Sequence, residues 1–113
     1  MHEYAVTQSV ITLALEEAYK VEASRILEIR LVIGDLSTIM DESVQMYFDI
    51  MSEGTIAEGA KLVFNRIKAE FKCRACGEVF VKPPKGFDCP KCGGLGTPTG
   101  VGKEFYIDSL EIE

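Results

Sequence analysis

The segment CRACGEVFVKPPKGFDCPKCGG constrains the fold more than any other part of the sequence, because it holds all four cysteines of the chain in two C-x-x-C pairs. Two residues between paired cysteines let both sulfurs of one turn face the same ion. The glycine after each pair can adopt the positive φ that directs backbone N–H groups at the thiolates. Four thiolates in tetrahedral geometry suit Zn²⁺. We therefore predict one structural zinc ion bound by Cys73, Cys76, Cys89 and Cys92.

Two other uses of the four cysteines fit the same spacing. Disulfide bonds need an oxidising compartment, but the chain does not open with the basic and then apolar segment of a secretory signal, so we expect a cytoplasmic protein. Iron in a rubredoxin-like electron carrier would use the same ligands, and sequence separates iron from zinc poorly. Because zinc with four thiolate ligands has no open coordination position, the predicted zinc site holds structure and catalyses no hydrolysis.

Apolar periodicity on either side of the cysteine segment predicts two helices and three strands. The first helix covers residues 4–21. The second starts at Asp41, which suits an N-cap, and stops at Gly54. Alternation of apolar and polar residues predicts strands over residues 26–33, 61–70 and 104–113.

The apolar residues of the last strand, FYIDSLEI, change from odd to even positions along the chain. An extra residue in a bulge near Asp108-Ser109 would compensate for this change of phase. The bulge would place four apolar side chains on one face, namely Phe105, Ile107, Leu110 and Ile112.

These elements predict an α+β fold, with a three-stranded sheet and two helices plus an inserted zinc-ribbon module. Residues 1–70 and 103–113 are expected to form the α+β domain, and residues 71–102 the zinc-ribbon domain. The two parts differ in charge, because residues 70–92 carry +2 within a chain whose net charge is −6.

The net charge of −6 argues against a surface that follows a nucleic-acid backbone. The basic residues of the cysteine segment also have a local reason to be there, since four thiolates around Zn²⁺ carry a formal charge of −2. The longest apolar runs are only a few residues, too short to cross a membrane. We expect neither nucleic acid nor a membrane as partner.

His2 is the single histidine of the chain. A histidine near a terminus is usually a solvated side chain, but position 2 offers a second use. The amino group of residue 1, the amide nitrogen of residue 2 and the imidazole can close two chelate rings on one metal. Ni²⁺ and Cu²⁺ favour this square-planar nitrogen coordination.

Taken together, several motifs make the chain resemble the HypA family, the nickel metallochaperones of nickel–iron hydrogenase maturation. They are MHE at the start, IGDLSTIMDES after the first strand, the EGA turn, the paired C-x-x-C motifs and the final apolar strand. The resemblance covers the whole chain. It implies a nickel-binding domain of two helices and three strands with an attached zinc ribbon, and Ni²⁺ as cargo.

The resemblance also implies a ligand set for nickel, centred on Met1, His2 and Glu3. The fourth donor is less uniform in the family. A family arrangement that uses an imidazole of the zinc domain is excluded here, because that segment contains no histidine. Asp41 is our candidate for the fourth place, with a simple N-cap as its other interpretation.

The partners that the resemblance implies are an accessory GTPase of nickel delivery and the precursor of the hydrogenase large subunit. The chain has no phosphate-binding loop of its own, so we expect a carrier and not an enzyme. The sequence leaves open whether urease is also a client and whether the chain is a monomer or a weak homodimer. The alternative function is a zinc-ribbon adaptor for RNA or transcription complexes.

Overall fold

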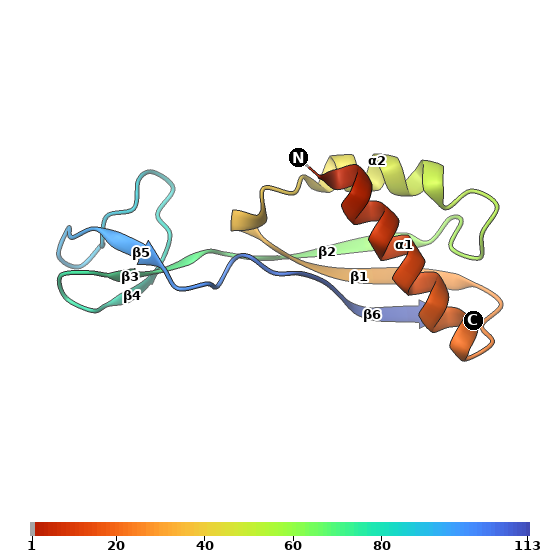
Figure 1. Ribbon diagram of the computed structural model, residues 1–113. Helices are drawn as coiled ribbons and strands as arrows, with labels where there is room; N and C mark the ends of the chain where they lie inside the picture. The colour runs from red at the N-terminus through yellow and green to blue at the C-terminus, as the bar shows by residue number, and fades with distance from the viewer. Residues whose placement is uncertain (1) are drawn as a thin grey trace.

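Two three-stranded sheets, arranged end to end, make up the computed structural model, which describes residues 2–113 (Figure 1). The molecule is elongated, measuring 55 × 24 × 17 Å. Both helices pack on the first sheet, and the second sheet has none (Figure 1). The elements in chain order are α1 (Glu3–Lys20), β1 (Ile26–Gly34), the 3-10 turn η1 (Asp35–Ser37), α2 (Asp41–Met51), β2 (Lys61–Ile67), β3 (Glu70–Cys73), β4 (Val79–Val81), β5 (Gly96–Pro98) and β6 (Phe105–Ile112).

The first sheet has the order β2-β1-β6, with β1 parallel to β2 and antiparallel to β6. Helix α2 makes the crossover between the parallel strands. The central strand carries Ile29, Leu31 and Ile33, all fully buried. Each such side chain contributes about 1.5–3 kcal/mol by leaving water. The helices complete this core with residues that include Val10, Ala14, Ala18, Val44 and Phe48.

The α+β fold class predicted from the sequence is confirmed, but the start of the second helix is not as predicted. Met40, in an extended conformation, occupies the N-cap position, and Asp41 is the first helical residue. The N-cap interpretation of Asp41 is therefore wrong. The physical reason is that the Asp41 carboxylate lies beside Arg66 and does not cap the helix. The helix ends at Met51, before the predicted stop at Gly54.

The strand predicted over residues 61–70 is divided in two, because the chain passes from one sheet to the other at Lys68 and Ala69. Here the returning chain crosses closely. A Cβ on Gly102 would lie 2.8 Å from the Ala69 Cα, and Gly102 has a φ of 110°. Only glycine suits this crossing. The returning segment contains β5.

The predicted bulge in β6 is confirmed. Arg30 pairs with Ser109 and the next residue of β1 pairs with Ile107, so Asp108 is the extra residue. As predicted, three apolar side chains of β6 pack against the core, Phe105, Ile107 and Leu110. The fourth, Ile112, is 39% exposed. It pairs with Ile26 at the end of the sheet, beyond a second register shift.

The second sheet has the order β4-β3-β5 and is antiparallel throughout. Its small core consists of Ala69, Phe71, Cys73, Phe80 and Cys89. Leu36, from η1, packs against this core. Backbone hydrogen bonds also connect the sheets, and the Leu36 N–H donates to the Gly102 carbonyl oxygen at 2.7 Å. The division into domains 1–70 with 103–113 and 71–102 stays a prediction.

Neither helix within residues 2–113 is long and apolar enough to cross a membrane.

Candidate metal sites

The four cysteines come together at one end of the second sheet. Cys73 ends β3 and Cys76 lies in the turn that follows, while Cys89 and Cys92 form the second turn. All four Sγ atoms lie within 4.8 Å of one another. Two of the separations are 3.4 Å, between Cys73 and Cys92, and 3.8 Å, between Cys76 and Cys89. Ligands of a tetrahedral zinc ion at 2.3 Å would lie about 3.8 Å apart, so the cluster has the right size for zinc.

Backbone N–H groups point at the sulfurs, as a metal-binding turn requires. The N–H of Cys76 lies 3.4 Å from the Cys73 Sγ, and the N–H of Lys91 lies 3.4 Å from the Cys89 Sγ. The glycine after each cysteine pair has a positive φ, 77° at Gly77 and 79° at Gly93, which confirms that part of the prediction. Such bonds stabilise thiolates, the form in which cysteine binds a metal.

The protonation of the cluster also favours a cation. The pKa of Cys73 is lowered to about 6, chiefly because the Cys76 N–H donates to its sulfur. At Cys92 the Gly94 N–H lowers the pKa, but the neighbouring cysteines outweigh it and raise the pKa to about 12. Four adjacent thiols therefore do not all ionise without a cation among them. A divalent metal would replace these protons, and the donor set suits structural zinc.

At the other candidate site, His2 is the N-cap of α1, and its side chain is exposed. Its carbonyl oxygen accepts the Val6 N–H at 2.9 Å, so the helix begins directly behind the histidine. Met1, the first predicted nickel ligand, lies outside the described residues. The imidazole is thus presented at the end of an ordered helix.

Glu3 is the first residue of α1 and is 8% exposed. Its Oε2 accepts the Met40 N–H at 3.1 Å, which joins the starts of the two helices (Figure 1). The pKa of Glu3 is lowered to about 2. The amino terminus contributes most to this shift, followed by the backbone N–H groups of Glu3 and Met40. Glu3 is therefore ionised at neutral pH and has a structural contact of its own.

Asp41 lies one residue beyond this contact and is paired with Arg66. Its Oδ1 is 3.4 Å from the Arg66 Nε. Within residues 2–113, the cysteines are the one group of three or more histidine, cysteine or acidic side chains whose ligand atoms lie within 4.8 Å of one another. The structure does not bring His2, Glu3 and Asp41 into such a group.

Arg66 is the residue that the sequence interpretation missed. It stands between Asn65 and Ile67 on an edge strand and belongs to no motif. Only the parallel pairing of β1 with β2, in which Ile33 lies opposite Arg66, places it beside the loop that leads to α2.

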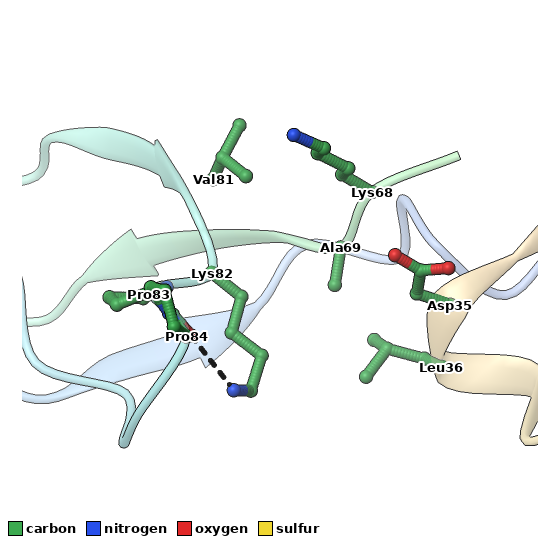
Figure 2. A pocket seen from close by; sticks show the side chains of 8 residues that line it. All are labelled: Asp35, Leu36, Lys68, Ala69, Val81, Lys82, Pro83 and Pro84. Atoms are coloured by element: carbon green, nitrogen blue, oxygen red, sulfur yellow. Dashed lines mark hydrogen bonds between the residues drawn. The ribbon is translucent and has the colours of Figure 1, made fainter. Parts of the chain in front are cut away.

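A cleft of about 610 Å³ lies between the two sheets, and sequence reasoning missed it as well. Figure 2 shows its lining, which consists of Asp35, Leu36, Lys68, Ala69, Val81, Lys82, Pro83 and Pro84. Asp35 is the only metal-ligand side chain in this lining. The Lys82 ammonium donates to the Pro83 carbonyl oxygen at 3.0 Å (Figure 2). With a single carboxylate, the cleft does not provide a metal site.

Comparison with known proteins gives a family that matches residues 1–112, described as "Hydrogenase/urease nickel incorporation, metallochaperone, hypA". A hydrogenase maturation factor HypA from Caldanaerobacter subterraneus subsp. tengcongensis is 48% identical over 114 residues, covering 100% of both chains. Another, from Dehalococcoides mccartyi (strain ATCC BAA-2266), is 41% identical and covers 100% of this chain and 95% of the relative.

Two solved structures of HypA proteins also match this chain. The solution structure of the Ni metallochaperone HypA from Helicobacter pylori matches with a TM-score of 0.65 and 30% identity, covering 99% of this chain and 97% of that chain. A second solution structure of a HypA protein matches with a TM-score of 0.70 and 30% identity, covering 100% and 97%.

Proposed function

The chain belongs to the HypA family of nickel metallochaperones for hydrogenase and urease, and from this we propose that it binds one Ni²⁺ at its amino terminus and delivers it during nickel–iron hydrogenase maturation. We further propose that the four cysteines hold a structural zinc ion. The observation that carries the nickel proposal is the exposed His2 at the start of an ordered helix.

Three nitrogens are proposed to bind nickel: the amino group of Met1, the amide nitrogen of residue 2 and the His2 imidazole. The first N–H groups at a helix start have no acceptor within the helix. Nickel can therefore take the amide nitrogen of residue 2 without breaking a helical hydrogen bond. Square-planar nitrogen coordination favours Ni²⁺ over Zn²⁺ at such a site.

The fourth nickel donor is proposed to come from Glu3, Asp41 or a partner protein. Glu3 already accepts the Met40 N–H, and Asp41 is already paired with Arg66. Nickel must compete for either carboxylate. Three chelating nitrogens would give nickel affinity, while the fourth donor has another partner within the protein. This combination suits a protein that has to release its cargo.

The zinc ion is proposed to be bound by Cys73, Cys76, Cys89 and Cys92 and to supply folding energy for residues 71–102. A four-thiolate site of this kind offers no open coordination position, so it takes no part in catalysis. Residues 1–70 with 103–113 are then the domain that handles nickel, and the second domain is the zinc ribbon.

We propose that the protein works in the cytoplasm as a carrier and not as an enzyme. Its proposed partners are an accessory GTPase and the precursor of the hydrogenase large subunit. Because the sequence has no phosphate-binding loop, any nucleotide hydrolysis in this process would be carried out by the GTPase. The α+β domain is proposed to make these contacts, since it carries most of the surface and of the negative charge.

Nickel titration by calorimetry tests the proposal, using protein with its native amino terminus. We expect one nickel to bind and one zinc, measured by metal analysis, to remain throughout. His2→Ala, or one residue added before Met1, should abolish nickel binding with zinc and helix content unchanged. Gln8→Ala, on the exposed side of α1, is the matched control and should bind nickel normally. Unchanged affinity after extension of the terminus would exclude the amino-terminal site.

A further inference from the structure

Arg66, near the end of β2, reaches over the loop that connects β1 to α2. Its Nη2 donates to the Ile39 carbonyl oxygen at 2.8 Å. Its Nε lies 3.7 Å from Oδ1 of Asp35 and 3.4 Å from Oδ1 of Asp41. These three oxygens belong to residues at the beginning, in the later part and at the end of the loop. One guanidinium therefore holds the whole loop to the edge strand of the sheet.

The Asp41 carboxylate is held by charge and not by a hydrogen bond. Its Oδ1 is buried and accepts no hydrogen bond within the described part of the chain. A desolvated carboxylate oxygen without a hydrogen bond is costly unless a cation lies beside it. Arg66 supplies that cation at 3.4 Å. Within the described residues, the Arg66 cation is therefore what compensates for the burial of this oxygen.

The same loop is attached on its other side to the helix that begins at the amino terminus. Met40, the residue before Asp41, donates its N–H to Glu3, and Glu3 directly follows His2. Asp41 is therefore one residue away from a contact with the proposed nickel-binding segment. Its carboxylate, however, is paired with Arg66.

We propose that Arg66 competes with nickel for the Asp41 carboxylate and so acts as a positioning residue for the fourth ligand. This inference rests on the proposed function. While Arg66 holds Asp41, the fourth nickel position is open to solvent or to a donor from a partner. When nickel takes Asp41, the ion pair opens. The cost of opening it weakens nickel binding and keeps the cargo transferable.

The size of the effect follows from the exposure of the pair. The Arg66 and Asp41 side chains are 36% and 35% exposed, so solvent screens their attraction. Exposed ion pairs contribute up to about 1 kcal/mol, and loss of this competition should therefore tighten nickel binding roughly twofold to fivefold. Release to a competing chelator should slow by a similar factor.

A double-mutant cycle tests the competition, with nickel affinity measured by calorimetry and release measured by stopped-flow transfer to a chelator. The cycle consists of the unmodified protein, Arg66→Gln, Asp41→Asn and the double variant. Arg66→Lys retains a positive charge and should change the affinity less than Arg66→Gln. Arg30→Gln is the matched control, because Arg30 also pairs with two carboxylates, Glu28 and Glu111, but among the described residues no ion pair or hydrogen bond joins it to the loop.

We expect Arg66→Gln to bind nickel more tightly, and to have no effect on nickel affinity when Asp41→Asn is also present. Zinc content and the melting curve should show that each variant is folded. Weaker or unchanged nickel binding in folded Arg66→Gln would overturn the competition. So would a gain in affinity that persists with Asp41→Asn, because Asp41 would then not be the group released.

His2→Ala, measured in the same series, distinguishes failure of the amino-terminal nickel site from failure of the competition by Arg66. If His2→Ala loses nickel while the cycle fails, the amino-terminal site stands and only the role of Arg66 is wrong. If His2→Ala retains nickel with unchanged affinity, the proposed function fails and the competition fails with it.

Discussion

Glu3 accepts a hydrogen bond from the backbone N–H of Met40, and this one carboxylate fastens the start of α1 to the start of α2. The two residues are far apart in the sequence, and the contact brings the start of α1 to the loop that Arg66 holds from the other side. We therefore expect this connection between the two helix starts to weaken when Glu3 is protonated.

Glu3→Gln should remove a pH-dependent part of the stability. Because folding lowers the pKa of Glu3 from 4.5 to about 2, its carboxylate stabilises the fold fully above pH 4.5, and this stabilisation is lost as the pH falls toward 2. The difference in melting temperature between the unmodified protein and Glu3→Gln should be largest near neutral pH and vanish near pH 2. Glu17→Gln is the control, since Glu17 is exposed. A difference that does not vary with pH would show that the charge of Glu3 is unimportant.

Cys73→Ser should lose zinc and unfold the second sheet while the helices remain. Cys73 is buried in the small core of that sheet and would be one of four ligands, so its loss removes both packing and coordination. Metal analysis should find no zinc, and NMR amide dispersion should be lost for residues 71–102 only. Ala75→Ser, at an exposed position within the same turn, should keep one zinc. Full zinc occupancy in Cys73→Ser would contradict the assignment.

Leu36→Ala should weaken the attachment between the two sheets. Leu36 belongs to the loop after β1 but packs against the core of the second sheet. Since the side chain is partly buried, we expect a loss of about 1–2 kcal/mol in the free energy of unfolding. Residual dipolar couplings should also show a wider range of orientations between the sheets. Leu27→Ala, 38% exposed and outside the junction, should leave the couplings unchanged, and equal changes in the couplings of both variants would argue against a specific attachment.

Gly34→Ala should be the most destabilising change at the junction. A Cβ on Gly34 would clash with the Gly102 carbonyl oxygen, and this is a backbone atom that cannot turn away. We expect a loss of about 3 kcal/mol in urea unfolding. Gly54→Ala provides the comparison, because nothing lies within 4 Å of its Cβ and only its positive φ opposes the change, at about 1 kcal/mol. A smaller loss in the free energy of unfolding at Gly34 than at Gly54 would mean that the backbone at the junction shifts to accommodate a Cβ at little cost.

Local patterns predicted those features whose cause is local. The bulge at Asp108 was visible in the sequence because a single extra residue shifts the apolar alternation. The four cysteines were assigned to one site because the spacing within each pair already fixes a turn.

The features that could not be predicted depend on contacts between distant segments. Asp41 has the residue type of an N-cap, but Arg66 lies beside its carboxylate only after β2 has paired with β1. The strand predicted over residues 61–70 is interrupted at Ala69, where Gly102 returns across it. No pattern in either segment alone reveals the other.

The insertion of the second sheet between β2 and β6 has a consequence for a molecule that has lost its zinc. Ile33 pairs with Arg66 on one side and with Phe105 on the other, so both ends of the inserted segment are anchored to the same central strand. Those ends lie two strand spacings apart, about 10 Å. An unfolded insert would then be a surface loop closed across the sheet, and the entropy of closing such a loop grows only slowly with its length. Loss of zinc would therefore leave the first sheet and both helices folded. The inserted segment would become an unfolded surface loop in place of the second sheet.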